Sequence, residues 1–118
     1  AILLAKAGVI RLNLDISDLH VECLPKKWFI PAPAQGVLAL QIREDDLIIQ
    51  EILDRLNSLS TQEEINVERK VLNLFNGGCQ LPLGVYCEKN STSTKIWVSI
   101  LKPNESYPLR LYKENISP

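Results

Sequence analysis

Residues 77–84 read Gly-Gly-Cys-Gln-Leu-Pro-Leu-Gly, and they decide the fold because they end one predicted helix and begin one predicted strand. Glycine adopts positive φ values without a Cβ clash, so Gly77 and Gly78 let the chain leave a helix and turn sharply. Cys79 then lies at a bare corner, where a bulky group has room to be bonded to its sulfur. The alternative is a small thiol that only fills space, which is the common state of a free cysteine.

Apolar residues alternate with other residues through the last third of the chain. The alternating positions are Leu81, Leu83, Val85 and Cys87, then Ile96, Val98 and Ile100, then Leu109 and Leu111. This alternation predicts three strands, because successive side chains of a strand point to opposite faces of the sheet. Turn-forming residues at 90–94 and 103–106 separate the three stretches. We therefore expect a three-stranded antiparallel sheet.

The segment from residue 61 or 62 to about residue 76 has the apolar spacing of a helix. A capping box, in which a hydroxyl residue precedes a glutamate by three positions, starts at either Ser60 or Thr61. The predicted inward-facing residues are Ile65, Val71, Leu72 and Phe75. One helix packed on a three-stranded sheet predicts an α+β fold for this part of the chain.

The first half of the chain shows patterns typical of α/β domains. Residues 1–12 read as the end of a helix, and residues 37–42 are apolar on both faces, which suits a strand buried on both sides. Residues 44–57 read as a helix with an acidic first turn. We expect remnants of α/β domains in residues 1–57 and the α+β unit in residues 58–118.

The composition excludes several classes of protein. Hydrophobic residues make up 46% of the 118 residues and the net charge is −1, without the basic stripe of a nucleic-acid-binding protein. No apolar run reaches the roughly 18 to 20 residues of a membrane span. Three irregularly spaced cysteines favour reduced thiols in the cytoplasm. The chain has no methionine and opens without an N-cap residue, so we expect a piece of a longer protein, with removal of an initiator methionine as the alternative.

Motifs for common catalytic centres are weak in this chain. The single histidine, His20, has no serine or cysteine partner at a known motif spacing, which favours a structural role. A zinc site would need His20, Cys23, Cys79 and Cys87, and no Cys-x-x-Cys pair is present. A cysteine-dependent redox or metal protein therefore stays open as an alternative that predicts bound metal or a disulfide.

Several stretches resemble, in the same order, motifs of the porphobilinogen deaminase (hydroxymethylbilane synthase) family. Residues 77–84 resemble its cofactor-attachment motif Gly-Gly-Cys-Gln-x-Pro-x-Gly. Residues 31–36, Pro-Ala-Pro-Ala-Gln-Gly, resemble its Pro-Ala-x-Gly-Gln-Gly, and residues 5–12, Ala-Lys-Ala-Gly-Val-Ile-Arg-Leu, resemble its Ala-x-Ala-Gly-Leu-x-Arg-Leu. The resemblance covers residues 1 to about 88, and beyond them only the strand pattern is shared.

The resemblance implies a transferase of tetrapyrrole (heme) biosynthesis. Members of the family condense four porphobilinogens into hydroxymethylbilane with release of ammonia, and they hold the growing chain on a covalent dipyrromethane cofactor. A soft sulfur nucleophile suits this attachment because ammonia loss from porphobilinogen leaves an electrophilic carbon. The resemblance thus implies porphobilinogen and linear oligopyrroles as partners, and no nucleic acid or membrane.

The cofactor-binding residues that the resemblance implies are Cys79 (through a thioether), Gly78, Arg11, Gly8, Gln35 and Gly36. Arg11 would bind the acetate and propionate groups of the pyrroles, because a guanidinium binds carboxylates in a bidentate manner. Gln35 and Gly36 would line the cleft between the first two domains. The alternative for Arg11 is a solvated cation that satisfies carbonyls at a helix end.

The resemblance also implies that parts of the family's sequence are missing from this chain, and the chain departs from the family motif at position 34. The family's catalytic aspartate has no counterpart here, and the closing helix of the third domain would follow Pro118, so we expect no catalytic residue and no deaminase activity in the isolated chain. Exposed sheet surfaces would allow it to self-associate. Ala34 stands where the family has glycine, and a positive φ there would cost about 1 kcal/mol. A non-catalytic α+β interaction module is the alternative function.

Overall fold

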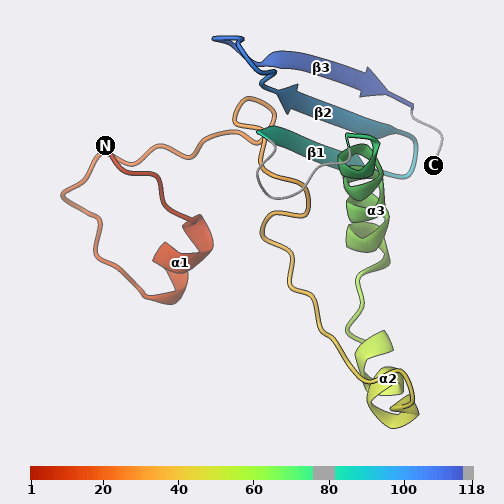
Figure 1. Ribbon diagram of the computed structural model, residues 1–118. Helices are drawn as coiled ribbons and strands as arrows, with labels where there is room; N and C mark the ends of the chain where they lie inside the picture. Colours follow the sequence, from red (N-terminus) through yellow and green to blue (C-terminus); the bar gives the residue numbers. More distant parts are fainter. Residues whose placement is uncertain (76–81, 116–118) are drawn as a thin grey trace.

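The computed structural model describes residues 1–75 and 82–115 and contains, within them, three helices and three strands (Figure 1). The elements in chain order are α1 (Lys6–Arg11), α2 (Leu47–Asp54), α3 (Leu59–Leu74), β1 (Leu83–Lys89), β2 (Thr94–Ile100) and β3 (Leu109–Glu114). The three strands form one antiparallel sheet in the order β1-β2-β3. The predicted α+β fold with a three-stranded meander is therefore confirmed.

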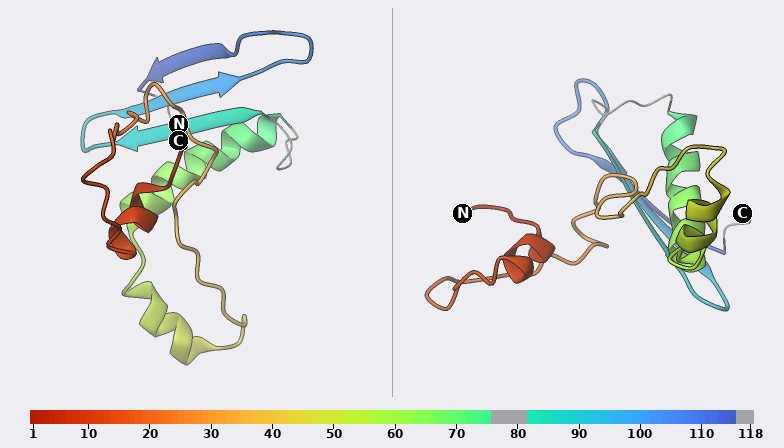
Figure 2. Two further views of the ribbon diagram at one scale, coloured as in Figure 1. Left: turned by 90° about the vertical axis from the view of Figure 1, so that its left-hand side faces the viewer. Right: turned by 90° about the horizontal axis from the view of Figure 1, so that it is seen from below.

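The core lies between α3 and the sheet, as the two views of Figure 2 show. The buried hydrophobic side chains all come from β1 and β2: Leu83, Val85, Cys87, Ile96, Val98 and Ile100. Val67, Val71 and Leu72 of α3 pack against this cluster. The alternation predicted for these two strands is confirmed from Leu83 onward, because every second residue points to the helix, and Leu81 lies outside the described residues.

The third strand is less covered than its pattern suggests. Leu111 stands opposite Val98 in the register, and Leu109 stands opposite Ile100. Their side chains nevertheless remain 54% and 43% exposed, respectively. Helix α3 contacts β1, the opposite edge of the sheet, and no described element covers β3. Alternation thus identified the face of each residue without showing how far the helix reaches.

Helix α3 begins earlier than the sequence predicts. Its N-cap is Ser58, whose hydroxyl accepts a hydrogen bond from the Thr61 N–H at 3.4 Å. The predicted caps at Ser60 and Thr61 are therefore wrong, because extended backbone at Ser58 already allows its hydroxyl to reach the first turn. The inward face also differs at one end, since Phe75 lies beyond the helix and is 44% exposed.

Helices α1 and α2 are short and unpacked. Neither contains a buried residue, and neither contacts another helix or strand of the described residues. Asp46 caps α2 by accepting from the Ile49 N–H at 3.2 Å, so the helix occupies only part of the predicted range 44–57. Among the residues that the structure describes, no helix has the length and apolarity needed to cross a bilayer.

The strand predicted for residues 37–42 is absent, and this prediction is wrong. These residues have no regular secondary structure, and Leu38 and Leu40 are 80% and 66% exposed. A strand needs neighbours that satisfy its backbone N–H and C=O groups. Residues 1–75 contain no strand, and the sheet formed by residues 83–114 does not extend to this segment.

Candidate functional site

Residues 33–36 form a turn with a positive φ at Ala34, the position where the family motif has glycine. Ala34 has φ 60° and Gly36 has φ 83°, both in the left-handed region. Hydrogen bonds from the Gln35 N–H to the Ala32 carbonyl (3.0 Å) and from the Val37 N–H to the Ala34 carbonyl (3.3 Å) close the turn. Ala34 therefore occupies a position that favours glycine, at a cost of about 1 kcal/mol.

A buried carboxylate on α3 connects this turn to the sheet. Glu68 is 7% exposed, and its Oε2 accepts from the Ala34 N–H at 2.7 Å. Its Oε1 accepts from the Cys87 N–H of β1 at 2.8 Å. Sequence reasoning missed this residue. A usable signal was present, because Glu68 lies three positions after Ile65 and four before Leu72, within the apolar stripe of the helix.

The two site residues predicted on α1 lie apart from this turn. Arg11 is in the last turn of α1, is exposed, and makes no ion pair with any described residue. A Cβ added to Gly8 would meet nothing within 4 Å, so no described residue packs closely against this glycine. Helix α1 contacts no other helix or strand and lies apart from α3 in Figure 1, whereas the turn is hydrogen-bonded to α3 through Glu68. This chain therefore does not bring Arg11 and Gly8 to Gln35 and Gly36.

The remaining predicted site residues, Gly78 and Cys79, lie outside the described residues. The last residue of α3 is Leu74 and the first residue of β1 is Leu83, so both flanks of residues 77–79 belong to the packed unit. The assignment of Cys79 as an attachment point stays a prediction.

The two other cysteines are free thiols in different environments. Cys23 is exposed, whereas Cys87 is 1% exposed in the core of the sheet. Burial, together with the nearby Glu64 and Glu68, raises the pKa of Cys87 from 9.0 to about 11. Cys87 is therefore a protonated packing residue at neutral pH. Within residues 1–75 and 82–115, no three His, Cys, Asp or Glu side chains gather as metal ligands would.

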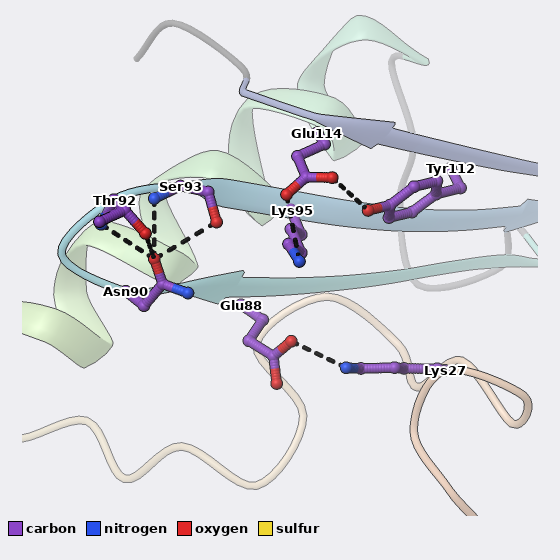
Figure 3. Close-up of polar contacts among 8 residues, drawn as sticks. All are labelled: Lys27, Glu88, Asn90, Thr92, Ser93, Lys95, Tyr112 and Glu114. Carbon is purple, nitrogen blue, oxygen red and sulfur yellow. Dashed lines mark hydrogen bonds and ion pairs between the residues drawn. The ribbon is translucent and has the colours of Figure 1, made fainter.

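The outer face of the sheet, opposite α3, carries two rows of interacting side chains. Tyr86, Trp97 and Tyr112 stack across the three strands with ring centroids 5.6 and 5.1 Å apart. In the next row, Lys95 pairs with Glu114 at 3.1 Å, and the Tyr112 hydroxyl donates to the same carboxylate at 3.0 Å (Figure 3). These contacts are local and mutually satisfied, which is typical of a structural surface.

The described residues line two surface hollows of about 410 and 490 Å³. One surrounds the turn between β1 and β2, where the Asn90 side chain accepts hydrogen bonds from Thr92 and Ser93 (Figure 3). The other lies at the start of α2, from Arg43 to Ile48. Of the predicted cofactor-binding residues that the structure describes (Gly8, Arg11, Gln35 and Gly36), none lines either hollow.

Two family models match the chain in succession. The model described as "Porphobilinogen deaminase, dipyromethane cofactor binding domain" matches residues 1–51, and the model described as "Porphobilinogen deaminase, C-terminal domain" matches residues 62–114. Together they cover both the unpacked first half and the α3–sheet unit.

Similar curated proteins carry the same name. "Porphobilinogen deaminase" of Clostridioides difficile is 44% identical over 87 residues, which are 74% of this chain and 28% of that protein. "Probable porphobilinogen deaminase" of Methanocaldococcus jannaschii is 42% identical over 93 residues, with 76% and 31% covered. "Porphobilinogen deaminase" of Geobacillus kaustophilus is 33% identical over 117 residues, with 99% and 37% covered.

This chain thus spans about a third of the length of these relatives, between 28% and 37%. The matches agree with each other in family and cover nearly every residue that the structure describes. The chain belongs to the porphobilinogen deaminase family.

Proposed function

We propose that this chain is the part of a porphobilinogen deaminase that holds the dipyrromethane cofactor and one side of the substrate cleft. The whole protein would condense four porphobilinogens into hydroxymethylbilane with release of ammonia, as a cytoplasmic enzyme of tetrapyrrole biosynthesis. The observation that carries the proposal is the ordered match of two models of this family to residues 1–51 and 62–114. The first of them is described by its cofactor.

The residues proposed to hold the cofactor are Cys79, Gly78, Arg11, Gly8, Gln35 and Gly36. The described ones fit a ligand that carries several carboxylates. Arg11 offers an exposed guanidinium that is not engaged by a described carboxylate. The Gly36 N–H donates to no described acceptor and lies in an exposed left-handed turn. Fixed cations and free backbone donors are the groups that bind carboxylates.

The cofactor supplies the covalent anchor on which the pyrrole chain grows. This chain's own residues would position it: Arg11 and Gly8 from α1, Gln35 and Gly36 from the turn, and Gly78 beside the sulfur of Cys79. Arg11 and the turn lie apart here, so the proposal requires further protein surface to assemble them into one cleft. We propose a domain boundary between residues 57 and 58, which falls between the two matched ranges.

Intact-mass spectrometry of the whole protein, produced in cells that make heme, tests the proposal. We expect a covalent increment equal to two linked pyrroles, and we expect Cys79→Ser to abolish it. Cys23→Ser is the matched control, because Cys23 is exposed and its replacement should leave the increment unchanged. An unmodified wild-type mass would contradict the proposal and favour a non-catalytic interaction module.

Two further expectations concern the 118 residues alone. We expect no deaminase turnover from them, because the family's catalytic aspartate has no counterpart in this sequence. We also expect the chain to self-associate, since many large apolar side chains are exposed, among them Leu38, Leu40 and Ile48 at 66% or more. Light scattering during gel filtration measures this, and a strict monomer would contradict it.

A further inference from the structure

Residues 26–34 form a strap that crosses β1 from the outer face of the sheet to the helix side. On the outer face, the Lys27 ammonium lies 2.9 Å from the Glu88 carboxylate (Figure 3). The same ammonium lies 4.8 Å from the centroid of the Trp97 ring. Lys26 lies over the Tyr86 ring, 5.2 Å from its centroid. Each contact is partly exposed and contributes modestly, but together they place the start of the strap.

The strap then passes the edge of β1 at backbone distance. The Val85 N–H donates to the Pro31 carbonyl at 2.8 Å, as a neighbouring strand would accept it. Gly84 makes this approach possible, because a Cβ at that position would lie 2.6 Å from the Ile30 carbonyl oxygen. The strap is therefore attached to β1 by its main chain as well as by side chains.

On the helix side, Glu68 holds the end of the strap. Its two oxygens accept from two different backbone N–H groups, Ala34 at 2.7 Å and Cys87 at 2.8 Å. The carboxylate is buried and pairs with no cation among the described residues. A buried carboxylate is costly unless its oxygens are hydrogen-bonded, so these two bonds account for its presence.

A second glutamate on α3 makes one of the two kinds of hydrogen bond that Glu68 makes, the one to the edge of β1, and therefore serves as a comparison for the other kind, the one to the turn. Glu64, one turn earlier on α3, accepts from the Lys89 N–H of β1 at 2.8 Å. It therefore satisfies the edge of β1, as Glu68 does at Cys87, but it makes no hydrogen bond to the strap or the turn. Among the side chains that the structure describes, Glu68 alone connects the edge of the sheet to Ala34.

We infer that Glu68 is a positioning residue for the turn that carries Gln35 and Gly36. By accepting from the N–H of Ala34, it fixes onto α3 and β1 a turn in which left-handed residues, Ala34 and Gly36, lie on either side of Gln35. The turn therefore moves with the α3–sheet unit, although the first family model assigns it to the preceding domain. The two hydrogen bonds that Glu68 accepts, here called the Glu68 clamp, do not depend on the proposed function. Only the relevance of the clamp to cofactor binding rests on that function.

Amide hydrogen exchange measured by NMR on the 118-residue chain tests the clamp. Glu68→Gln keeps the shape but leaves one acceptor oxygen for two N–H groups. Because a hydrogen bond to a charged group contributes about 1.5 kcal/mol or more, the Ala34 or Cys87 amide should exchange about tenfold faster. Glu64→Gln is the matched control: it keeps one acceptor oxygen for its single N–H partner, Lys89, and should leave the exchange of Ala34 and Cys87 unchanged. The inference is overturned by unchanged Ala34 and Cys87 exchange in Glu68→Gln, or by equal acceleration of Ala34 in both variants.

The wild-type chain keeps the inference testable should Glu68→Gln fail to fold. The Ala34 amide should then be protected in the wild type while the exposed amides of residues 38–41 are not, and an Ala34 amide that exchanges as fast as they do would overturn the clamp.

In the whole protein, Glu68→Gln should raise KM for porphobilinogen several-fold with a smaller change in kcat, and Glu64→Gln should change neither. Absence of a covalent cofactor in the wild type would refute the proposed function and leave the exchange result standing. Unchanged KM with a confirmed clamp would overturn the positioning role.

Discussion

Helices α2 and α3 follow each other closely in the chain, and the more apolar of the two is the one without a packing partner. Helix α2 reads Leu-Ile-Ile-Gln-Glu-Ile-Leu-Asp and has no buried residue, with Leu47 and Ile48 71% and 77% exposed. Helix α3 is polar over most of its length, yet it covers the sheet and buries a glutamate. Burial in this molecule therefore depends on which surface a helix can reach rather than on its apolar content.

The contrast extends to the two halves of the chain. The N-terminal half reaches the packed unit through the strap, residues 26–34, whereas α1 and α2 contact no other helix or strand of the described residues. The strap is attached by backbone hydrogen bonds and a buried carboxylate, which need defined geometry. The apolar side chains of α1 and α2 are not directional and have no surface here to pack against. The N-terminal half therefore contains one fixed segment and two unpacked helices.

The largest expected effect distinguishes the core from α2. Val85→Ala removes buried methyl groups from a fully buried side chain and should lower the free energy of unfolding by roughly 2 kcal/mol. Ile48→Ala removes a larger group from α2 and should change it by less than about 0.5 kcal/mol. Urea unfolding followed by tryptophan fluorescence measures both. Equal losses would show that α2 packs in solution.

The attachment of the strap can be broken at a single glycine. Gly84→Ala places a Cβ 2.6 Å from the Ile30 carbonyl oxygen, so the strap must move away from β1. We expect a loss of roughly 1 to 2 kcal/mol and weaker protection of the Val85 amide. Gly8→Ala on α1 is the control, because the new methyl group meets nothing within 4 Å. Unchanged hydrogen exchange of the Val85 amide in Gly84→Ala would contradict the close passage of the strap along the edge of β1.

The buried thiol of Cys87 gives the packed unit a stability that depends on pH. The native pKa of Cys87 is raised from 9.0 to about 11 by burial, so the native state holds its proton more tightly than the unfolded state does. The resulting stability is complete below pH 9 and is lost as the pH rises through 11. Unfolding midpoints between pH 8 and about 11.5 should fall more steeply in the wild type than in Cys87→Ala. Parallel curves would show that the thiol titrates normally.

The smallest expected effect concerns the turn at the end of the strap. Ala34→Gly relieves a φ of 60° but raises the entropy of the unfolded chain, so a stabilisation below about 1 kcal/mol is expected. Ala32→Gly, at a neighbouring position without a positive φ, should destabilise by up to about 1 kcal/mol. The difference between the two variants measures the strain. Equal effects on thermal unfolding would indicate an unstrained Ala34.

Local patterns predicted the packed unit well. Alternation located β1 and β2 and their buried faces, and the departure from glycine at Ala34 anticipated a left-handed turn. The predicted start of α3 was two to three residues late, because Ser58 competes with Ser60 and Thr61 as a cap and only the backbone geometry selects it. The predicted strand at 37–42 was wrong, because an apolar pattern indicates a tendency to be buried and cannot supply the neighbouring strands.

For the candidate site too, the sequence named residues but did not place them relative to one another. The resemblance of the sequence to the family's motifs implies Cys79, Arg11 and the Gln35–Gly36 turn as the chemistry-bearing positions, and these assignments stay predictions. Nothing in the spacing placed Arg11 relative to the turn, and the chain keeps them apart. Glu68 was overlooked because a glutamate on a helix is usually solvated, and its role depends on two backbone N–H groups that lie 34 and 19 residues away.

The sequence by itself determined the family, the strand faces and the residue types available for binding a carboxylate-rich ligand, since these depend on residue identity and local spacing. Only the tertiary structure decided which helix is packed, where the strap crosses β1 and why a glutamate is buried. The physical reason is that backbone hydrogen bonds and burial are satisfied between segments far apart in the chain, and local pattern does not specify that partner.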